Sequence, residues 1–185
     1  MRDDRSQESE VLVVLLRSIF GLTLFAAVTA LPAWAGPPLI CHAIDIGAAR
    51  SLPWIARGSW DGTDPSYDVS RLVDDTLAIL SESAPASVRM ETLRRAVIYS
   101  ARVPGLSDRL MNRLMARALS SQAAGHPDAQ ALFEAGYAIE TVRQAAWVYG
   151  MLHEPQRDGW FVRTDPQIDG WALMRTSQQA ATASR

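Results

Sequence analysis

Residues 128–152, DAQALFEAGYAIETVRQAAWVYGML, form a long helical pattern that few charges interrupt. Asp128 stands where an N-cap residue is expected, since a carboxylate there accepts hydrogen bonds from the free N–H groups of the first turn. Apolar positions lie on several sides of this predicted helix: Leu132, Phe133, Gly136, Ile139, Val142, Ala146 and Trp147. A helix that is apolar on several sides is usually buried by its neighbours. We therefore predict that this helix is the central one.

Four shorter amphipathic helices are predicted around it, because apolar residues recur every three or four positions in each. Their predicted ranges are Asp68–Ser81, Ala84–Arg102, Ser107–Gln122 and Gln167–Gln179. Ser107 is expected to be the N-cap of its helix. No run shows the sustained alternation of a strand, and Gly159–Arg163 is the only weak candidate. The predicted fold class is all-α.

The helices are expected to form a compact bundle of stacked antiparallel hairpins, because the connections between them are short. An α-solenoid is the alternative, since the helices start about 20 residues apart, a rhythm typical of helical repeats. The predicted organisation is a signal peptide at 1–35, a loop-rich segment with a short helix at 36–67, a helical domain at 68–180 and a frayed tail at 181–185.

The start of the chain has the three parts of a secretory signal peptide. A charged leader ends at Arg17, an uncharged apolar run covers Ile19–Leu31, and Ala33-Trp34-Ala35 supplies the small residues of a cleavage site. We therefore predict cleavage after Ala35 and export to the periplasm or out of the cell.

A retained inner-membrane anchor through residues 11–31 is the alternative to cleavage. This stretch approaches the roughly 20 apolar residues that a spanning helix needs. Arg17 interrupts it, however, and a charge inside the bilayer is costly.

The charge balance argues against nucleic acid as a partner. The chain has 18 Lys and Arg against 20 Asp and Glu, a net charge of −2, so no positive field attracts a polyanion. The sequence also contains no nucleophile elbow, phosphate-binding glycine loop or His-Glu-x-x-His zinc helix. No cofactor is predicted.

One group of metal-ligating residue types lies near the predicted mature start. Cys41, His42 and Asp45 offer a thiol, an imidazole and a carboxylate, and on a helix His42 and Asp45 would share a face. His153 and Glu154 would complete a site if the fold brought them near. The interpretation that we favour is structural, with Cys41 buried and His42 on the surface, because cysteine is among the most buried residue types.

The same region carries a resemblance. The sequence of Gly36–Gly47, GPPLICHAIDIG, followed by Ser51-Leu-Pro-Trp54, resembles the mature start of uncharacterised exported bacterial proteins. The resemblance implies a shared architecture and no activity.

The tripeptide His126-Pro127-Asp128 is the signature of J-domain co-chaperones, in which it links two helices. The loop expected after the tripeptide is missing, and export would remove the protein from the cytosolic chaperone. A helix-capping turn at Asp128 is the interpretation that we favour.

Three arginines recur every four residues on one predicted helix: Arg109, Arg113 and Arg117. This stripe is a candidate docking surface for an acidic polymer, a lipid headgroup or a partner helix, and the neighbouring helix would extend it with Arg94, Arg95 and Arg102. A solvated face whose arginines pair with acids is the commoner arrangement.

The loop-rich segment holds three aromatic residues, Trp54, Trp60 and Tyr67. They offer rings for stacking on a sugar, but packing against the ends of the helices is the interpretation that we favour. Asp61 and Asp64 supply oxygens that suit calcium, without the spacing of a calcium loop.

Together these features favour an exported, non-catalytic α-helical interaction or scaffold module. The expected partner is a protein of the cell envelope, and a membrane is expected only if the signal helix is retained. The alternative is a small envelope enzyme or a metal- or ligand-binding protein that uses Cys41, His42 and Asp45.

Overall fold

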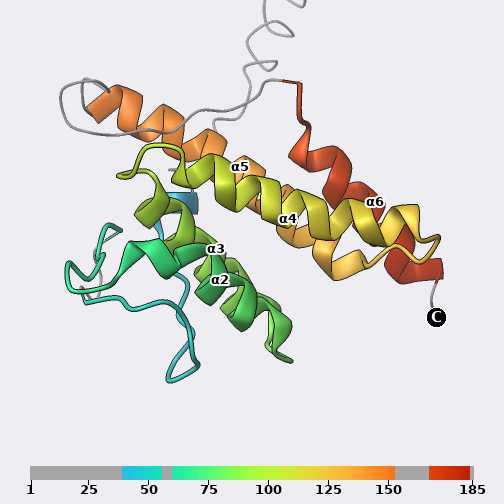
Figure 1. Ribbon diagram of the computed structural model, residues 1–185, viewed down its shortest axis with the longest axis horizontal. Helices are drawn as coiled ribbons and strands as arrows, with labels where there is room; N and C mark the ends of the chain where they lie inside the picture. The colour runs from blue at the N-terminus through green and yellow to red at the C-terminus, as the bar shows by residue number, and fades with distance from the viewer. Residues whose placement is uncertain (1–38, 56–59, 153–166, 184–185) are drawn as a thin grey trace, which may run out of the picture. The chain divides into compact units, whose positions relative to one another are not determined.

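A computed structural model describes residues 39–55, 60–152 and 167–183 (Figure 1). All of them belong to the second of two compact units, Pro37–Arg185. The predicted signal peptide at 1–35, the strand candidate Gly159–Arg163, and the site residues His153 and Glu154 lie outside the described residues. Among the helices that are described, none combines the length and apolar character that a membrane span requires.

Helices dominate the described residues, which confirms the all-α class. The only β-pairing there is an isolated antiparallel bridge between Trp54 and Thr63. The elements are two short 3-10 helices, η1 (Leu39–Cys41) and η2 (Val69–Arg71), and the α-helices α2 (Leu72–Ser81), α3 (Ala86–Ser100), α4 (Leu106–Ala123), α5 (Ala129–Leu152) and α6 (Gly170–Ala183).

The central position predicted for α5 is confirmed. This helix packs against α3, α4 and α6, while α2 packs mainly on α3 (Figure 1). Because α5 contacts elements that are distant in the chain as well as its neighbours, the arrangement is a bundle and lacks the neighbour-only contacts of a solenoid.

Three local predictions are corrected. Ser107 does not cap α4, because the turn before this helix needs a left-handed residue, which Gly105 supplies at φ 70° as the N-cap. In the first part of the loop-rich segment at 36–67, the expected short helix is reduced to the three residues of η1. α6 continues through Ala183, past the start of the tail that was expected to fray.

The core has two adjoining groups of buried side chains. The larger group joins α2, α3, α4 and α5 through leucines that are almost inaccessible to solvent: Leu72, Leu80, Leu93, Leu110, Leu114 and Leu132. In the smaller group, Ile40 packs with Val97, Ile98, Val142 and Val148. Since burying each such side chain contributes about 1.5–3 kcal/mol, Ile40 helps to hold the N-terminal segment on α3 and α5.

The prediction that α5 is buried on several sides is wrong at Trp147. Its side chain is 48% exposed, whereas the neighbouring Ala145 and Val148 are buried. Ala145 and Val148 face the smaller core group, and Trp147 lies on another side of the helix. α5 is therefore covered on fewer sides near its C-terminal end than the sequence suggested.

Two glycines allow α5 and α6 to cross closely. A Cβ atom added at Gly136 would lie 2.5 Å from the carbonyl oxygen of Gly170, and one added at Gly170 would lie 2.6 Å from that of Gly136. Glu140 fixes the start of α6, because its Oε1 accepts a hydrogen bond from the N–H of Gly170 at 3.1 Å. The contact therefore requires residues without a side chain at both positions.

Candidate functional site

The cluster predicted around Cys41 does not form a convergent site among the described residues. Cys41 is half-buried at the end of η1, while His42 and Asp45 are exposed and lie on no helix, so they share no helical face. Asp45 accepts a hydrogen bond from the backbone N–H of Gly47 at 2.9 Å. No group of three or more His, Cys, Asp or Glu residues in the described ranges is placed to hold a metal ion.

The Cys41 thiol is also poorly activated. Burial raises its pKa above the ordinary value of 9.0, and the positive charge of Arg94 opposes this effect without cancelling it. The thiol is therefore protonated at neutral pH, whereas a nucleophile or metal ligand acts as the thiolate.

Asp128 has the capping role that was favoured for the His-Pro-Asp tripeptide. Its Oδ1 accepts hydrogen bonds from the N–H groups of Gln130 and Ala131, at 2.9 and 3.0 Å. These bonds satisfy free donors of the first turn of α5. The capping interpretation is confirmed.

The aromatic residues of the loop-rich segment pack against α3. Trp54 meets Tyr99 edge to face at a centroid distance of 6.2 Å, and Tyr67 lies 5.1 Å from the same ring. The guanidinium groups of Arg94 and Arg95 lie 5.0 and 5.4 Å from the centroid of Trp54. These rings take part in internal packing and cation–π contacts, as the favoured interpretation expected.

A buried ionic cluster on α3 fastens the N-terminal segment. Arg94 is fully buried and donates to both carboxylate oxygens of Glu91, at 2.7 and 2.8 Å. The same guanidinium donates to the backbone carbonyls of Ile40 and Trp60, both at 3.0 Å. Arg95 adds a hydrogen bond to the carbonyl of Leu52 at 2.7 Å.

The pKa of Glu91 reflects this surrounding. Burial alone raises it, but hydrogen bonds from Arg94, Arg95 and the backbone N–H of Ile44 hold the pKa below its ordinary value. Glu91 is therefore ionised at neutral pH, and its negative charge is balanced by the arginines bonded to it.

The arginine stripe on α4 divides into two parts. Arg117 forms an ion pair with Glu134 at 2.8 Å, and Glu134 also accepts a hydrogen bond from the buried Arg89. Arg109 and Arg113 are exposed, and neither side chain forms an ion pair or hydrogen bond with any described residue. The prediction of a face paired with acids therefore holds for one arginine of the three.

The stripe does not extend onto α3, which corrects the sequence prediction. Arg94 is fully buried, Arg95 is mostly covered and bonded to Glu91, and Arg102 is bonded to Asp61. Each of these arginines is paired with an acidic residue of the same chain.

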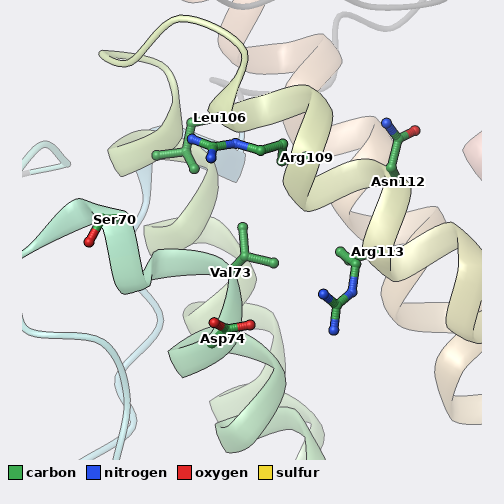
Figure 2. Close-up of a pocket in the computed structure, with 7 residues that line it drawn as sticks. All are labelled: Ser70, Val73, Asp74, Leu106, Arg109, Asn112 and Arg113. Carbon is green, nitrogen blue, oxygen red and sulfur yellow. The ribbon is translucent and has the colours of Figure 1, made fainter.

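Arg109 and Arg113 line a cleft of about 310 Å³ between the start of α2 and the first half of α4 (Figure 2). The α2 wall is formed by Val73 and Asp74 together with Ser70 of η2, and the α4 wall also contains Leu106 and Asn112. Asp74 is exposed and, like the two arginines, has no charged partner among the described residues. The cleft therefore carries two positive charges and one negative charge.

No protein-family model matches this sequence, and no curated protein or solved structure matches it. The resemblance of residues 36–54 to exported bacterial proteins stays a prediction.

The walls of the cleft are fixed by the core behind them. Leu106, Leu110 and Leu114 of α4 are buried at intervals of one turn, which places Arg109 and Arg113 along the border of the buried face. On the other wall, Asp75 is held by Tyr67 and Arg71, at 2.8 and 3.1 Å. The neighbouring Asp74 is left facing the cleft.

The arrangement suits recognition of an acidic group. A guanidinium stays charged at all physiological pH values and presents a planar fork of donors that matches a carboxylate or phosphate. Leu106 is buried and Val73 is half-buried, so the cleft also has an apolar floor. The four-residue spacing identified the two arginines but not the cleft, because the α2 wall comes from a different part of the chain.

A second depression, of about 290 Å³, lies beside α3, α5 and α6. Its charged lining residue, Arg89, is occupied by Glu134 and by the carbonyls of Leu80 and Ala84. Burial raises the pKa of Glu134, against the opposing effect of Arg117 and Arg89. Because Arg89, Glu134 and Arg117 are paired with one another, we assign them a structural role.

Proposed function

We propose that this chain is an exported, non-catalytic α-helical interaction module that holds an acidic group of a protein partner in the cleft between α2 and α4. The observation that carries the proposal is the state of Arg109 and Arg113. These two arginines share one cleft and have no acidic partner among the described residues. A carboxylate that enters the cleft gains charge-assisted hydrogen bonds without breaking an existing ion pair.

Contrast with the rest of the protein supports this choice. Arg89, Arg94, Arg95 and Arg117 are bonded to buried carboxylates of the chain itself. An external acid would have to displace those internal partners, at the cost of leaving a buried charge unpaired. Arg109 and Arg113 require no such exchange.

A binding experiment with a charge-matched control tests the proposal. A fluorescein-labelled glutamate oligomer is titrated with the protein at low salt and again at about 0.5 M salt, where interactions between exposed charges are screened. We expect binding that weakens with salt, and binding at least about tenfold weaker for the Arg109→Gln/Arg113→Gln variant.

The control is Arg50→Gln/Arg175→Gln, which removes two exposed arginines from other surfaces of the protein. It has the same net charge as the test variant and is expected to bind like the unmodified protein. Equal affinities for the two double variants would show that the cleft is not the binding site.

The exported state is a separate part of the proposal and rests on the pattern of residues 1–35. The mass of the protein recovered from fractionated cells tests it. A chain that begins at Gly36 in the envelope fraction is expected. A full-length chain in the membrane fraction would support the anchor at residues 11–31 instead.

A further inference from the structure

We infer that the occupant of the α2–α4 cleft is a partner helix of mixed charge, with two acidic side chains one turn apart toward Arg109 and Arg113 and a basic side chain toward Asp74. This inference rests on the proposed function and names the partner of the same cleft. Three properties of the lining carry it: the spacing of the arginines, the acid on the opposite wall and the apolar floor.

The spacing of the arginines matches a helix. Arg109 and Arg113 are four residues apart on α4, so their Cβ atoms are separated by about 5–6 Å. Acidic side chains four residues apart on a second helix have the same separation. A single carboxylate engages one guanidinium fork bidentately and leaves the other arginine unpaired.

The length of the cleft points to a peptide in preference to a small ion. Its α4 wall runs from Leu106 to Arg113, which at the rise of an α-helix is about 10 Å, or about two turns. Two turns of a partner helix lie along such a wall. An isolated phosphate or carboxylate covers only a part of it.

Asp74 weakens the binding of uniformly negative partners without preventing it, so a partner of mixed charge is preferred. It lies on the wall opposite the arginines (Figure 2) and has no cationic partner among the described residues. A nucleic acid strand, a polyphosphate or an acidic homopolymer places a negative charge near this carboxylate, and like charges repel. A lysine or arginine on the partner removes the repulsion and adds an attraction.

The floor supplies the third property. Val73 packs against the larger core group, and Leu106 is 1% exposed. Val73 lies between Asp74 and Arg109 (Figure 2), so an apolar side chain on the partner that contacts Val73 falls between its acidic and basic residues. Acidic, apolar and basic stripes side by side describe an amphipathic helix.

Two helical peptides test the inference. The first carries two glutamates four residues apart, leucines on the adjacent stripe and a lysine on the far side of the leucines. The second differs only in a glutamate at the lysine position. We expect the unmodified protein to bind the first peptide about threefold or more tightly than the second, as measured by fluorescence anisotropy at low salt.

The Asp74→Asn variant is expected to remove this preference. We expect it to weaken binding of the mixed-charge peptide and to strengthen binding of the uniformly acidic one, because the charge that distinguishes them is gone. Glu82→Gln removes one exposed negative charge just past the C-terminal end of α2, outside the cleft; it serves as the control and is expected to preserve the preference. Thermal melting of each variant checks that the fold is intact.

The results separate this inference from the proposed function. Equal or tighter binding of the uniformly acidic peptide by the unmodified protein would overturn the mixed-charge helix and leave an acidic partner in place. Displacement of the labelled first peptide by free glutamate at a similar concentration would show that the site takes a small zwitterion, which also overturns the helix. Failure of the glutamate oligomer and both peptides to bind at low salt would overturn both proposals.

Discussion

Arg94 combines two properties that rarely occur together, a permanent positive charge and complete burial. Its side chain has 0% exposure and is surrounded by Glu91 and by the carbonyls of Ile40 and Trp60. A buried charge is tolerated only where paired and hydrogen-bonded. Arg94 is therefore a main link between the N-terminal segment and α3, beside Arg95 and Glu91.

Replacement of Arg94 by leucine is expected to destabilise the protein strongly. The change leaves Glu91 buried without its main partner and removes the donors to two backbone carbonyls, so we expect a loss of about 3–5 kcal/mol in the free energy of unfolding. Denaturant unfolding followed by circular dichroism measures this loss. Arg71→Leu, at a more exposed ion pair between η2 and α2, is the control and is expected to cost less than about 1 kcal/mol. Losses of similar size would contradict the role assigned to Arg94.

For single charged residues, the sequence did not predict which side chains form ion pairs and which are buried. The four-residue period identified Arg109, Arg113 and Arg117 as one stripe. It did not show that Glu134, on another helix, pairs with Arg117 and with neither of the other two arginines of the stripe. Nor did the sequence distinguish Arg94 from Arg109, since both are arginines on amphipathic helices, and burial depends on which elements pack together.

The helices were the most predictable elements. α2, α3, α4, α5 and α6 all lie where apolar residues recur with helical period, because that period is itself the result of burying one face. The errors fall at the ends and at contacts between helices. Gly105 starts α4 because of its backbone conformation, and Gly136 was read as one more apolar position of α5 although its function is to admit α6.

The crossing of α5 and α6 is expected to fail when Gly136 is replaced by alanine. The added methyl group would lie 2.5 Å from the carbonyl oxygen of Gly170 and 2.8 Å from the side chain of Met174. Overpacking of this kind costs about 1–3 kcal/mol. Because α6 packs mainly on α5, we expect faster hydrogen exchange throughout α6, as measured by mass spectrometry.

The control for the crossing is Ala116→Ser, which adds one atom at an exposed position of α4. It is expected to leave exchange in α6 unchanged. Unaltered exchange in Gly136→Ala would show that the helices can separate slightly without loosening α6, and would remove the requirement for glycine.

At the scale of the whole molecule, two features that the sequence presented as separate are joined. The N-terminal segment was predicted as a loop-rich stretch before a helical domain. In the structure Ile40 belongs to the core of that domain, and Arg94 and Arg95 bind the segment's carbonyl groups. Contacts between residues this distant in the chain have no local pattern, so neither this docking nor the pairing of α2 with α4 around the cleft followed from periodicity.

Docking of the segment makes the reactivity of Cys41 a measure of the state of the whole protein. Burial raises the pKa of the thiol above 9.0, and the thiolate is the reactive form, so we expect slow labelling by a disulfide reagent at pH 7 and a rate that keeps rising above pH 9. The rate at pH 7 is expected to be about tenfold below that of the chain unfolded in guanidinium, in which both the burial and the pKa shift are lost. Arg94→Leu is expected to bring the rate close to the unfolded value by releasing the segment, whereas Arg175→Leu, at an exposed pair on α6, leaves it unchanged. A native chain that is labelled as fast as the unfolded one would mean that residues 39–55 do not stay docked in solution.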